Sequence, residues 1–443
     1  MKSRSVKLLL ILAFLIQLLV SPLYLKPDMA VGESAQPSDG SGAIVEKPAR
    51  ILPPPSVIKG DDGSFRFAVF GDSRTGDVLE SSIADAEFGS KQFTDMDIIE
   101  ENEKEFAIYR NQLFDRIASG FKTDSKKSGD DKFGFALFGG DFVRMGTRGY
   151  WNELKNSFLD KIVGNDVNSR RIFPSIGNHE EWAGPELEKR LGIASATKGA
   201  LDLYFDAFPW LVSDTGWGHE EGLHNYAFYI DNNVFVTLCA GNMVFDSSFP
   251  DNADGIFLCE QCTFGEQMDW FKQVLDYGIQ TQHIKNVFVQ YHKPSYSSSK
   301  HPPLKQCSDP LNVMSVYKSK YPSMNMFVFN GHNHTTELYR TKDGITVLVA
   351  GGGGAPQKAS DTNRDWSSYK ETQKELFWDS LKPHVNGWQK RVNYFVVTVK
   401  SDKIDVQEMC LTNIDGTYRF EKGIKIDQDG KITAPDHNTG FLN

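Results

Sequence analysis

The sequence predicts an α/β fold built on one large β-sheet or on two packed sheets. Ten short apolar runs have the length and composition of buried strands. Segments with helical spacing of apolar residues alternate with these runs in the first half, and strands crowd together near the end. Ten strands exceed a typical single sheet, and the late ones are expected to form antiparallel edges.

The expected elements follow one another along the chain from residue 65. The strands are expected at residues 65–70, 133–138, 171–176, 226–230, 234–238, 286–290, 324–329, 345–350, 394–399 and 404–409. Helical faces are indicated by Phe106, Tyr109, Leu113 and Ile117, by Trp151, Leu154, Phe158 and Ile162, and by Met268, Phe271, Leu275 and Ile279. At this spacing, aromatic and methionine side chains are expected in the core.

The N-terminal segment is typical of an exported protein. Basic residues at positions 2, 4 and 7 precede residues 8–20, of which only Gln17 is polar. We expect residues 1–30 to be a signal peptide or an N-terminal membrane anchor, and the protein to be periplasmic or extracellular. Residues 31–57 are rich in Pro, Gly and Ser and are expected to form a flexible linker. Residues 58–443 would form the folded domain.

Charge and cysteine content narrow the class further. A formal net charge of −10 gives no basic surface for nucleic acid, so no obligate nucleic-acid partner is expected. Five cysteines in an exported chain fit one or two disulfides with one cysteine left over. Cys259 and Cys262 have the spacing of a zinc half-site or a redox motif, but structural disulfides or inert thiols are favoured.

Five polar motifs follow apolar runs at the expected ends of strands. They are Gly71-Asp72-Ser73-Arg74, Gly139-Gly140-Asp141, Gly177-Asn178-His179-Glu180, Tyr291-His292-Lys293-Pro294 and Gly331-His332-Asn333-His334. Loops at the carboxyl ends of parallel strands meet at one edge of a sheet. Asp, Asn and His bind divalent metals, so the motifs predict a metal centre.

The order of these motifs resembles the calcineurin-like metallophosphoesterase family, closest to the purple acid phosphatase type. The resemblance covers roughly residues 65–355. It implies a four-layer α/β/β/α sandwich with two mixed β-sheets. It also implies two divalent or trivalent metal ions, with Fe, Mn or Zn favoured by the histidines and the lack of thiolates.

The same resemblance implies a role for each motif residue. Asp141 would bridge two metals, with Asp72 and His334 on the first and Asn178, His292 and His332 on the second. A metal-bound hydroxide would be the nucleophile, and His179 would act on the leaving group or stabilise its charge. Glu180 either accepts a hydrogen bond from a metal-binding histidine and so orients it, or is an ordinary solvated residue.

Three positions near these motifs are candidates for substrate binding. The family usually has histidine at position 74, but this chain has Arg74, and a guanidinium does not bind metal. The purple acid phosphatase tyrosine is replaced by Arg144. Either arginine could bind phosphate or form a structural salt bridge. His301 could face the substrate or lie in a surface loop.

The sequence therefore predicts a metal-dependent phosphoester hydrolase that acts on a phosphorylated small molecule. Phosphomonoesters are the first choice of substrate and phosphodiesters the nearest alternative. A non-catalytic metal-binding or ligand-binding module with a degenerate first metal site remains the alternative from another class.

Overall fold

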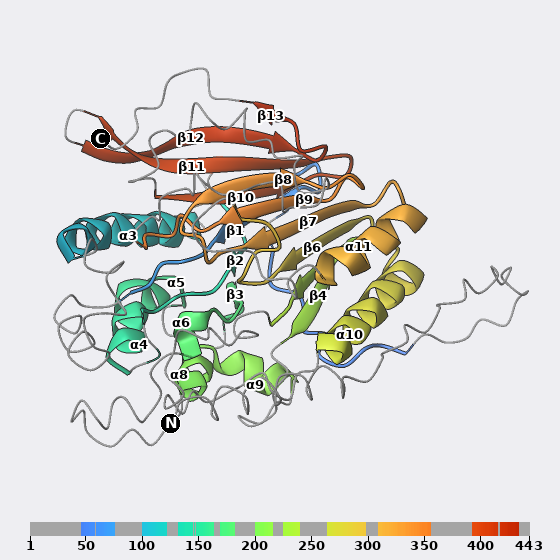
Figure 1. Cartoon of the computed structure of the whole chain (residues 1–443), viewed down its shortest axis with the longest axis horizontal. Coiled ribbons are helices and arrows are strands. Elements are labelled where there is room, and N and C mark those ends of the chain that lie inside the picture. Colours follow the sequence, from blue (N-terminus) through green and yellow to red (C-terminus); the bar gives the residue numbers. More distant parts are fainter. Residues whose placement is uncertain are drawn as a thin grey trace, which may run out of the picture. The chain divides into compact units, whose positions relative to one another are not determined.

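Two mixed β-sheets stack face to face in the computed structural model, and helices cover the outer face of each (Figure 1). The structure describes residues 46–57, 59–75, 100–121, 132–144, 146, 148–163, 169–181, 200–215, 225–239, 264–297, 309–355, 392–414 and 417–433. All of these residues belong to one structural unit, Val45–Asn443. The predicted α/β sandwich with two mixed sheets is confirmed.

The first sheet has the strand order β13-β12-β11-β10-β1-β2-β3. Strands β1 (Phe65–Phe70), β2 (Phe135–Phe138) and β3 (Ile172–Pro174) run parallel. The chain then returns to β1 through antiparallel strands β10 (Asn393–Val399), β11 (Ile404–Ile414), β12 (Thr417–Asp427) and β13 (Ile432–Thr433). These late strands form the antiparallel edge that the sequence predicts.

The second sheet has the order β4-β5-β6-β7-β9-β8. Its centre is parallel and consists of β5 (Asn233–Thr237), β6 (Asn286–Gln290), β7 (Asn325–Asn330) and β9 (Thr346–Ala350). Strands β4 (Tyr226–Ile230) and β8 (Thr336–Arg340) close its two edges in antiparallel pairing. The carboxyl ends of β6 and β7 therefore lie side by side.

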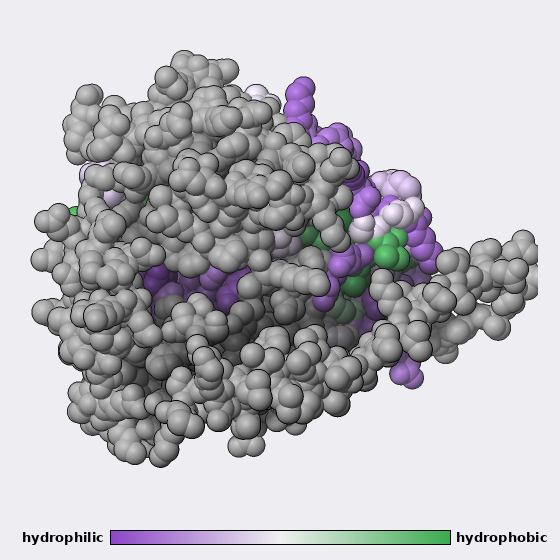
Figure 2. Space-filling view, in the orientation of Figure 1, coloured by the Kyte–Doolittle hydropathy of each residue, from purple (hydrophilic) through white to green (hydrophobic). Residues whose placement is uncertain are grey.

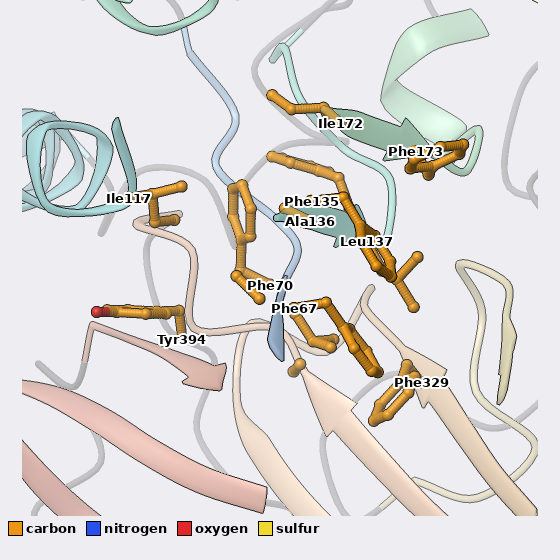
Figure 3. Close-up of a cluster of buried hydrophobic side chains, with 14 of the residues drawn as sticks. Phe67, Phe70, Ile117, Phe135, Ala136, Leu137, Ile172, Phe173, Phe329 and Tyr394 are labelled. Carbon is orange, nitrogen blue, oxygen red and sulfur yellow. The ribbon is translucent and has the colours of Figure 1, made fainter. Parts of the chain in front are cut away.

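Alternation along the strands separates an aromatic inner layer from the outer layers. Phe67 of β1 contacts Phe235 and Phe288 of the second sheet, with ring centroids 5.2 and 5.3 Å apart. It also lies against Phe329, as Figure 3 shows. On the opposite face of β1, Phe70 packs on Phe158 at 5.7 Å. Each sheet thus buries both faces, which explains its continuous apolar strands.

Two groups of helices form the outer layers. The first sheet is covered by α3 (Glu100–Gly120), α4 (Arg148–Leu154), η2 (Lys155–Leu159) and α5 (Asp160–Val163). The second sheet is covered by α10 (Phe264–Tyr277), η3 (Gly278–Gln282) and α11 (Asp309–Lys320). Short helices α6 (Asn178–Glu181), α8 (Ala200–Ala207) and α9 (Pro209–Thr215) follow β3. Figure 2 shows a hydrophobic area among hydrophilic residues near α10 and α11, where Val316 is 68% exposed.

Part of the range expected to be a linker packs on the second sheet. Ile51 forms a parallel bridge with Ala227, and the Leu52 amide donates to the Ala227 carbonyl at 2.8 Å. Trp270 of α10 donates its indole N–H to the Ala49 carbonyl at 2.8 Å. The ordered body therefore begins before residue 58, and residues 46–57 do not behave as a free linker.

Several sequence predictions fall outside the described residues. These are the N-terminal segment 1–30, His301, and the cysteines at positions 259, 262 and 307. Cys239 and Cys410 are buried. In the part of the chain that the structure describes, no helix has the length and apolarity needed to cross a membrane.

Candidate metal centre

Loops from both sheets meet where β1, β2, β3, β6 and β7 end. The Asp72 amide donates to the Gly140 carbonyl at 3.0 Å, which joins the loops after β1 and β2. The Gly331 amide donates to the His292 carbonyl at 2.9 Å, which joins the loops after β7 and β6. A Cβ added at Gly139 would lie 3.4 Å from the Gly331 nitrogen, so the two sheets approach closely at this point. The structure thus brings all five sequence motifs together.

Four donor atoms converge in what we call the second half-site. Asn178 Oδ1 lies 3.1 Å from His292 Nε2 and 3.0 Å from His332 Nδ1. The two histidine nitrogens are 3.3 Å apart, and Asp141 Oδ1 lies 3.2 Å from His292 Nε2. With metal–nitrogen bonds of about 2.0–2.1 Å, neighbouring ligand atoms in a tetrahedral shell are about 3.3 Å apart. The observed spacing matches that of a metal coordination shell.

The surroundings of His292 are suited to a cation in this half-site. Its Nδ1 lies 2.7 Å from the Gly139 carbonyl, which can only accept, so Nδ1 carries a proton. Nε2 therefore faces the oxygens of Asn178 and Asp141 with either a lone pair or a second proton. Although burial lowers the pKa of His292, the charges of Asp141 and Asp72 raise it to about 9. Oxygen and nitrogen acceptors this close require a proton or a metal ion between them.

The first half-site consists of Asp72, Asp141 and His334, whose ligand atoms all lie within 4.8 Å of one another. Asp72 Oδ1 accepts from the His332 amide at 2.9 Å and lies 3.8 Å from His334 Nε2. Asp72 Oδ2 is buried and has no hydrogen-bond partner among the described residues. Burial, together with the charge of Asp141, raises the pKa of Asp72 well above its usual value. An unsatisfied buried carboxylate oxygen fits a cation, but this half-site offers fewer protein donors.

Arg74 lies in the same loop as Asp72 and adds a fixed positive charge. Its amide donates to the Asp141 carbonyl at 2.9 Å, and its own carbonyl accepts from Arg110 at 3.1 Å. The charge of Arg74 contributes to lowering the pKa values of Asp141 and His179, and it partly opposes the rise in the pKa of Asp72. The guanidinium is therefore electrostatically coupled to the centre, although it cannot be a metal ligand.

His179 lies beside the bridging position. Its Nδ1 donates to the Arg144 carbonyl at 2.5 Å, which leaves Nε2 directed toward the centre, 3.7 Å from Asp141 Oδ2. Burial and the charge of Arg74 lower the pKa of His179 well below its usual value. Arg144 is only 7% exposed, and the contact it makes to His179 uses its backbone carbonyl.

Glu180 has a role that the sequence did not reveal. It is fully buried, and its carboxylate accepts backbone N–H groups from both the β2 and the β3 loops. One of these bonds comes from the Gly177 amide at 2.7 Å, at the start of α6. It is the bond that the glutamate makes in a capping box, and glycine has no side chain to make the other one. A Gly-x-x-Glu spacing after a strand is the sequence signal for this bond.

The backbone is strained at the centre. Five of the non-glycine residues with positive φ belong to it: Asp72 at 59°, Arg74 at 45°, Asp141 at 57°, His332 at 72° and His334 at 52°. Such conformations are unfavourable for residues with a Cβ and cluster at functional sites. The loops are therefore held in place by their surroundings.

Comparisons with known proteins found relatives by structure alone. No protein-family profile matches the chain, and no curated protein sequence matches it. One similar solved structure is GAP50, the anchor in the inner membrane complex of Plasmodium, with 12% identity, a TM-score of 0.40, and coverage of 81% of this chain and 88% of that one. Another is PhoD, with 9% identity, a TM-score of 0.42, and coverage of 88% and 74%.

A third similar structure is described as a "Putative 5'-Nucleotidase" from Staphylococcus aureus, with 11% identity, a TM-score of 0.28, and coverage of 86% of this chain and 56% of that one. PhoD and this protein have folds of the calcineurin-like metallophosphoesterase type. These are distant likenesses in fold. The function proposed below depends on the arrangement of the site residues.

Proposed function

We propose that the chain is a metal-dependent phosphoester hydrolase that acts on phosphomonoesters with two metal ions. One observation carries this proposal: six donor residues from five loops converge, with a histidine beside them. The donors are Asp72, Asp141, Asn178, His292, His332 and His334, and the histidine is His179. A Ser, Cys or Lys nucleophile is not required for this chemistry.

Each half-site would hold one ion, with Asp141 between them. Bound there, the ions would polarise the phosphoryl oxygens and lower the pKa of a water molecule for in-line attack. The mixture of histidine nitrogens and carboxylate oxygens favours Fe, Mn or Zn. The protein's own contribution is to hold these donors in fixed loops, as the inter-loop hydrogen bonds described above do.

His179 would exchange a proton with the leaving oxygen through Nε2. Its Nδ1 is already committed to the Arg144 carbonyl, so Nε2 is the ring atom that can reach a substrate. Arg74 would add a positive charge for the phosphate, because a guanidinium can bind two phosphate oxygens at once. A phosphorylated small molecule outside the cytoplasm is the proposed substrate, in keeping with the predicted export.

A non-catalytic metal-binding module is the second candidate, and Arg74 is the observation that favours it. Arginine in place of a metal-binding histidine leaves the first half-site with Asp72, Asp141 and His334. If that half-site does not retain its ion, the two-metal chemistry is lost. Phosphodiesters remain the alternative substrate within the enzyme class.

The proposal can be tested with the full chain. Elemental analysis gives the bound metal, and the activity on p-nitrophenyl phosphate is compared with that on bis(p-nitrophenyl) phosphate. We expect His179→Ala to retain metal but lose about 10²- to 10⁴-fold in turnover, as expected for a proton-transfer group. Asp141→Asn should lose both metal and activity, whereas His283→Asn, at an exposed position, should change neither. A metal-loaded protein that hydrolyses neither ester would refute the proposal that the chain is a phosphoester hydrolase.

A further inference from the structure

The loops after β2 and β3 are tied together by reciprocal hydrogen bonds. Glu180 Oε2 accepts from the Asp141 amide at 2.9 Å, and Oε1 accepts from the Phe142 amide at 2.6 Å and the Val143 amide at 3.3 Å. In the opposite direction, Asp141 Oδ1 accepts from the His179 amide at 3.1 Å. These contacts connect the loop of the bridging carboxylate to the loop of the second half-site.

The two loops are also in direct backbone contact. A Cβ added at Gly177 would lie 2.3 Å from both the amide nitrogen and Oδ1 of Asp141 and 2.8 Å from Glu180 Oε2. No side chain fits between them. The position of Asp141 relative to Asn178 therefore depends on the Glu180 carboxylate and on this glycine.

We propose that Glu180 is the positioning residue of the metal centre: its carboxylate holds Asp141 at the spacing from Asn178 and His292 that a shared metal ion requires. This inference rests on the proposed function only in assuming that the centre binds metal. The carboxylate is suited to this role because an ionised carboxylate only accepts hydrogen bonds. Among the described residues, the four hydrogen bonds that it accepts all come from backbone N–H groups.

Glu180→Gln isolates this role because it changes one oxygen to an NH₂ group with almost no change in volume. The new NH₂ group would face backbone N–H groups, so at least one of them loses its acceptor and the two donors repel. The Asp141 loop should then shift relative to Asn178. Groups that orient metal ligands typically contribute 10- to 100-fold in metal affinity.

Glu408→Gln is the matched control. Glu408 is also fully buried, and it accepts from the Asn393 side chain at 2.5 Å and the Ile424 amide at 3.1 Å. It lies in β11, and these two partners belong to β10 and β12. A change in metal affinity that occurs in Glu180→Gln but not in Glu408→Gln separates positioning from general destabilisation.

The experiment is a titration of the full chain with Co²⁺, followed by its visible absorption, which reports coordination geometry, and by thermal unfolding. We expect Glu180→Gln to weaken Co²⁺ binding about 10- to 100-fold and to alter the spectrum. Glu408→Gln should lower the melting temperature while leaving binding and spectrum unchanged. Glu180→Asp keeps the carboxylate on a side chain that is shorter by one methylene group. It should bind Co²⁺ with an affinity between those of wild type and Glu180→Gln.

The outcomes distinguish this inference from the proposed function. Wild-type affinity and spectrum in Glu180→Gln would overturn the inference. If Glu180→Gln does not fold, wild-type binding by Glu180→Asp would overturn it instead. A wild-type protein that binds no Co²⁺ overturns the metal centre and the inference together. Weakened binding in the variants of a protein that is inert on phosphoesters would refute the enzyme and support the inference.

Discussion

The two half-sites should differ in metal affinity, and replacing one histidine in each tests this. The second half-site offers four donor atoms with neighbours at 3.0–3.3 Å, whereas Asp72 Oδ1 and His334 Nε2 in the first half-site are 3.8 Å apart. His292→Ala removes a donor from the preassembled shell. His334→Ala removes one from the looser group.

The magnitude follows from the number of ligands. Four-ligand zinc sites bind with about 10–16 kcal/mol, so each ligand contributes about 3 kcal/mol. Since about 1.4 kcal/mol is a factor of ten, His292→Ala should weaken the tighter of two binding events about 100-fold. In His334→Ala, the affinity of the tighter binding event should stay within about threefold of wild type, because His334 is not a ligand of the second half-site. The affinity of the weaker binding event should fall instead.

The assay is competition for Zn²⁺ against a chromophoric chelator, which resolves the two binding events. His283→Asn is the control, because His283 is exposed and adopts a positive φ of 50° that asparagine tolerates. Equal losses at the tight site in His292→Ala and His334→Ala would refute the inequality of the half-sites. A His292→Ala variant whose affinity at the tight site is unchanged would also refute this inequality.

Three further predictions concern the same centre. Arg74→His should raise the metal content toward two ions per chain by elemental analysis; an unchanged content with reduced turnover would instead make Arg74 a substrate contact. Because the metal-free His292 has a pKa of about 9 and metal needs the unprotonated ring, affinity should rise up to about tenfold per pH unit from pH 7 to 9 and then level off; a flat profile contradicts this. Gly177→Ala should lower the free energy of unfolding in urea by about 1–3 kcal/mol, because its Cβ would overlap Asp141. Gly265→Ala is its control, because a Cβ at Gly265 would lie more than 4 Å from other described atoms outside its own helix. Equal losses of unfolding free energy in the two variants would exclude overlap with Asp141 as the cause.

Several strands whose residues are nearly all buried could be predicted closely from sequence. The expected ranges 65–70, 226–230 and 286–290 coincide with β1, β4 and β6. In these strands nearly all residues are buried, so each is a continuous apolar run bounded by polar residues. Burial on both faces is what makes such strands visible in a sequence.

Other strands were missed because tertiary contacts, and not local apolar character, explain them. β8 contains Glu337, which is buried because Asn333, Thr335 and Tyr339 all donate hydrogen bonds to it. A strand with a buried carboxylate has no alternating pattern to detect. β12 was missed for the opposite reason, since several of its residues are exposed at the edge of the sheet.

The chemistry of the centre was visible in the motifs, whereas their assembly into one centre was predicted from the family resemblance and not from the spacing of the residues. The motif residues stand out because they end apolar strands. Nothing in the spacing reveals that β6 and β7 of one sheet meet β1 and β2 of the other, because sheet packing sets that contact. The orientation of the Glu180 side chain could not be predicted from sequence. A loop carboxylate can face solvent or, as here, the backbone of a neighbouring loop.

The centre combines several unfavourable features that a metal ion would offset together. Asp72, Arg74, Asp141, His332 and His334 adopt left-handed backbone conformations, each of which costs about 1–2 kcal/mol. Their sum is comparable with the net stability of a domain, about 5–15 kcal/mol. In addition, Asp72 Oδ2 is buried and has no hydrogen bond to any residue that the structure describes. The rigid sheets and the Glu180 contacts hold these loops in place, and a cation between the carboxylates would remove the electrostatic part of the strain. Folding of these loops and metal binding would therefore be coupled, because the same donor positions that are unfavourable without a cation would form its coordination shell.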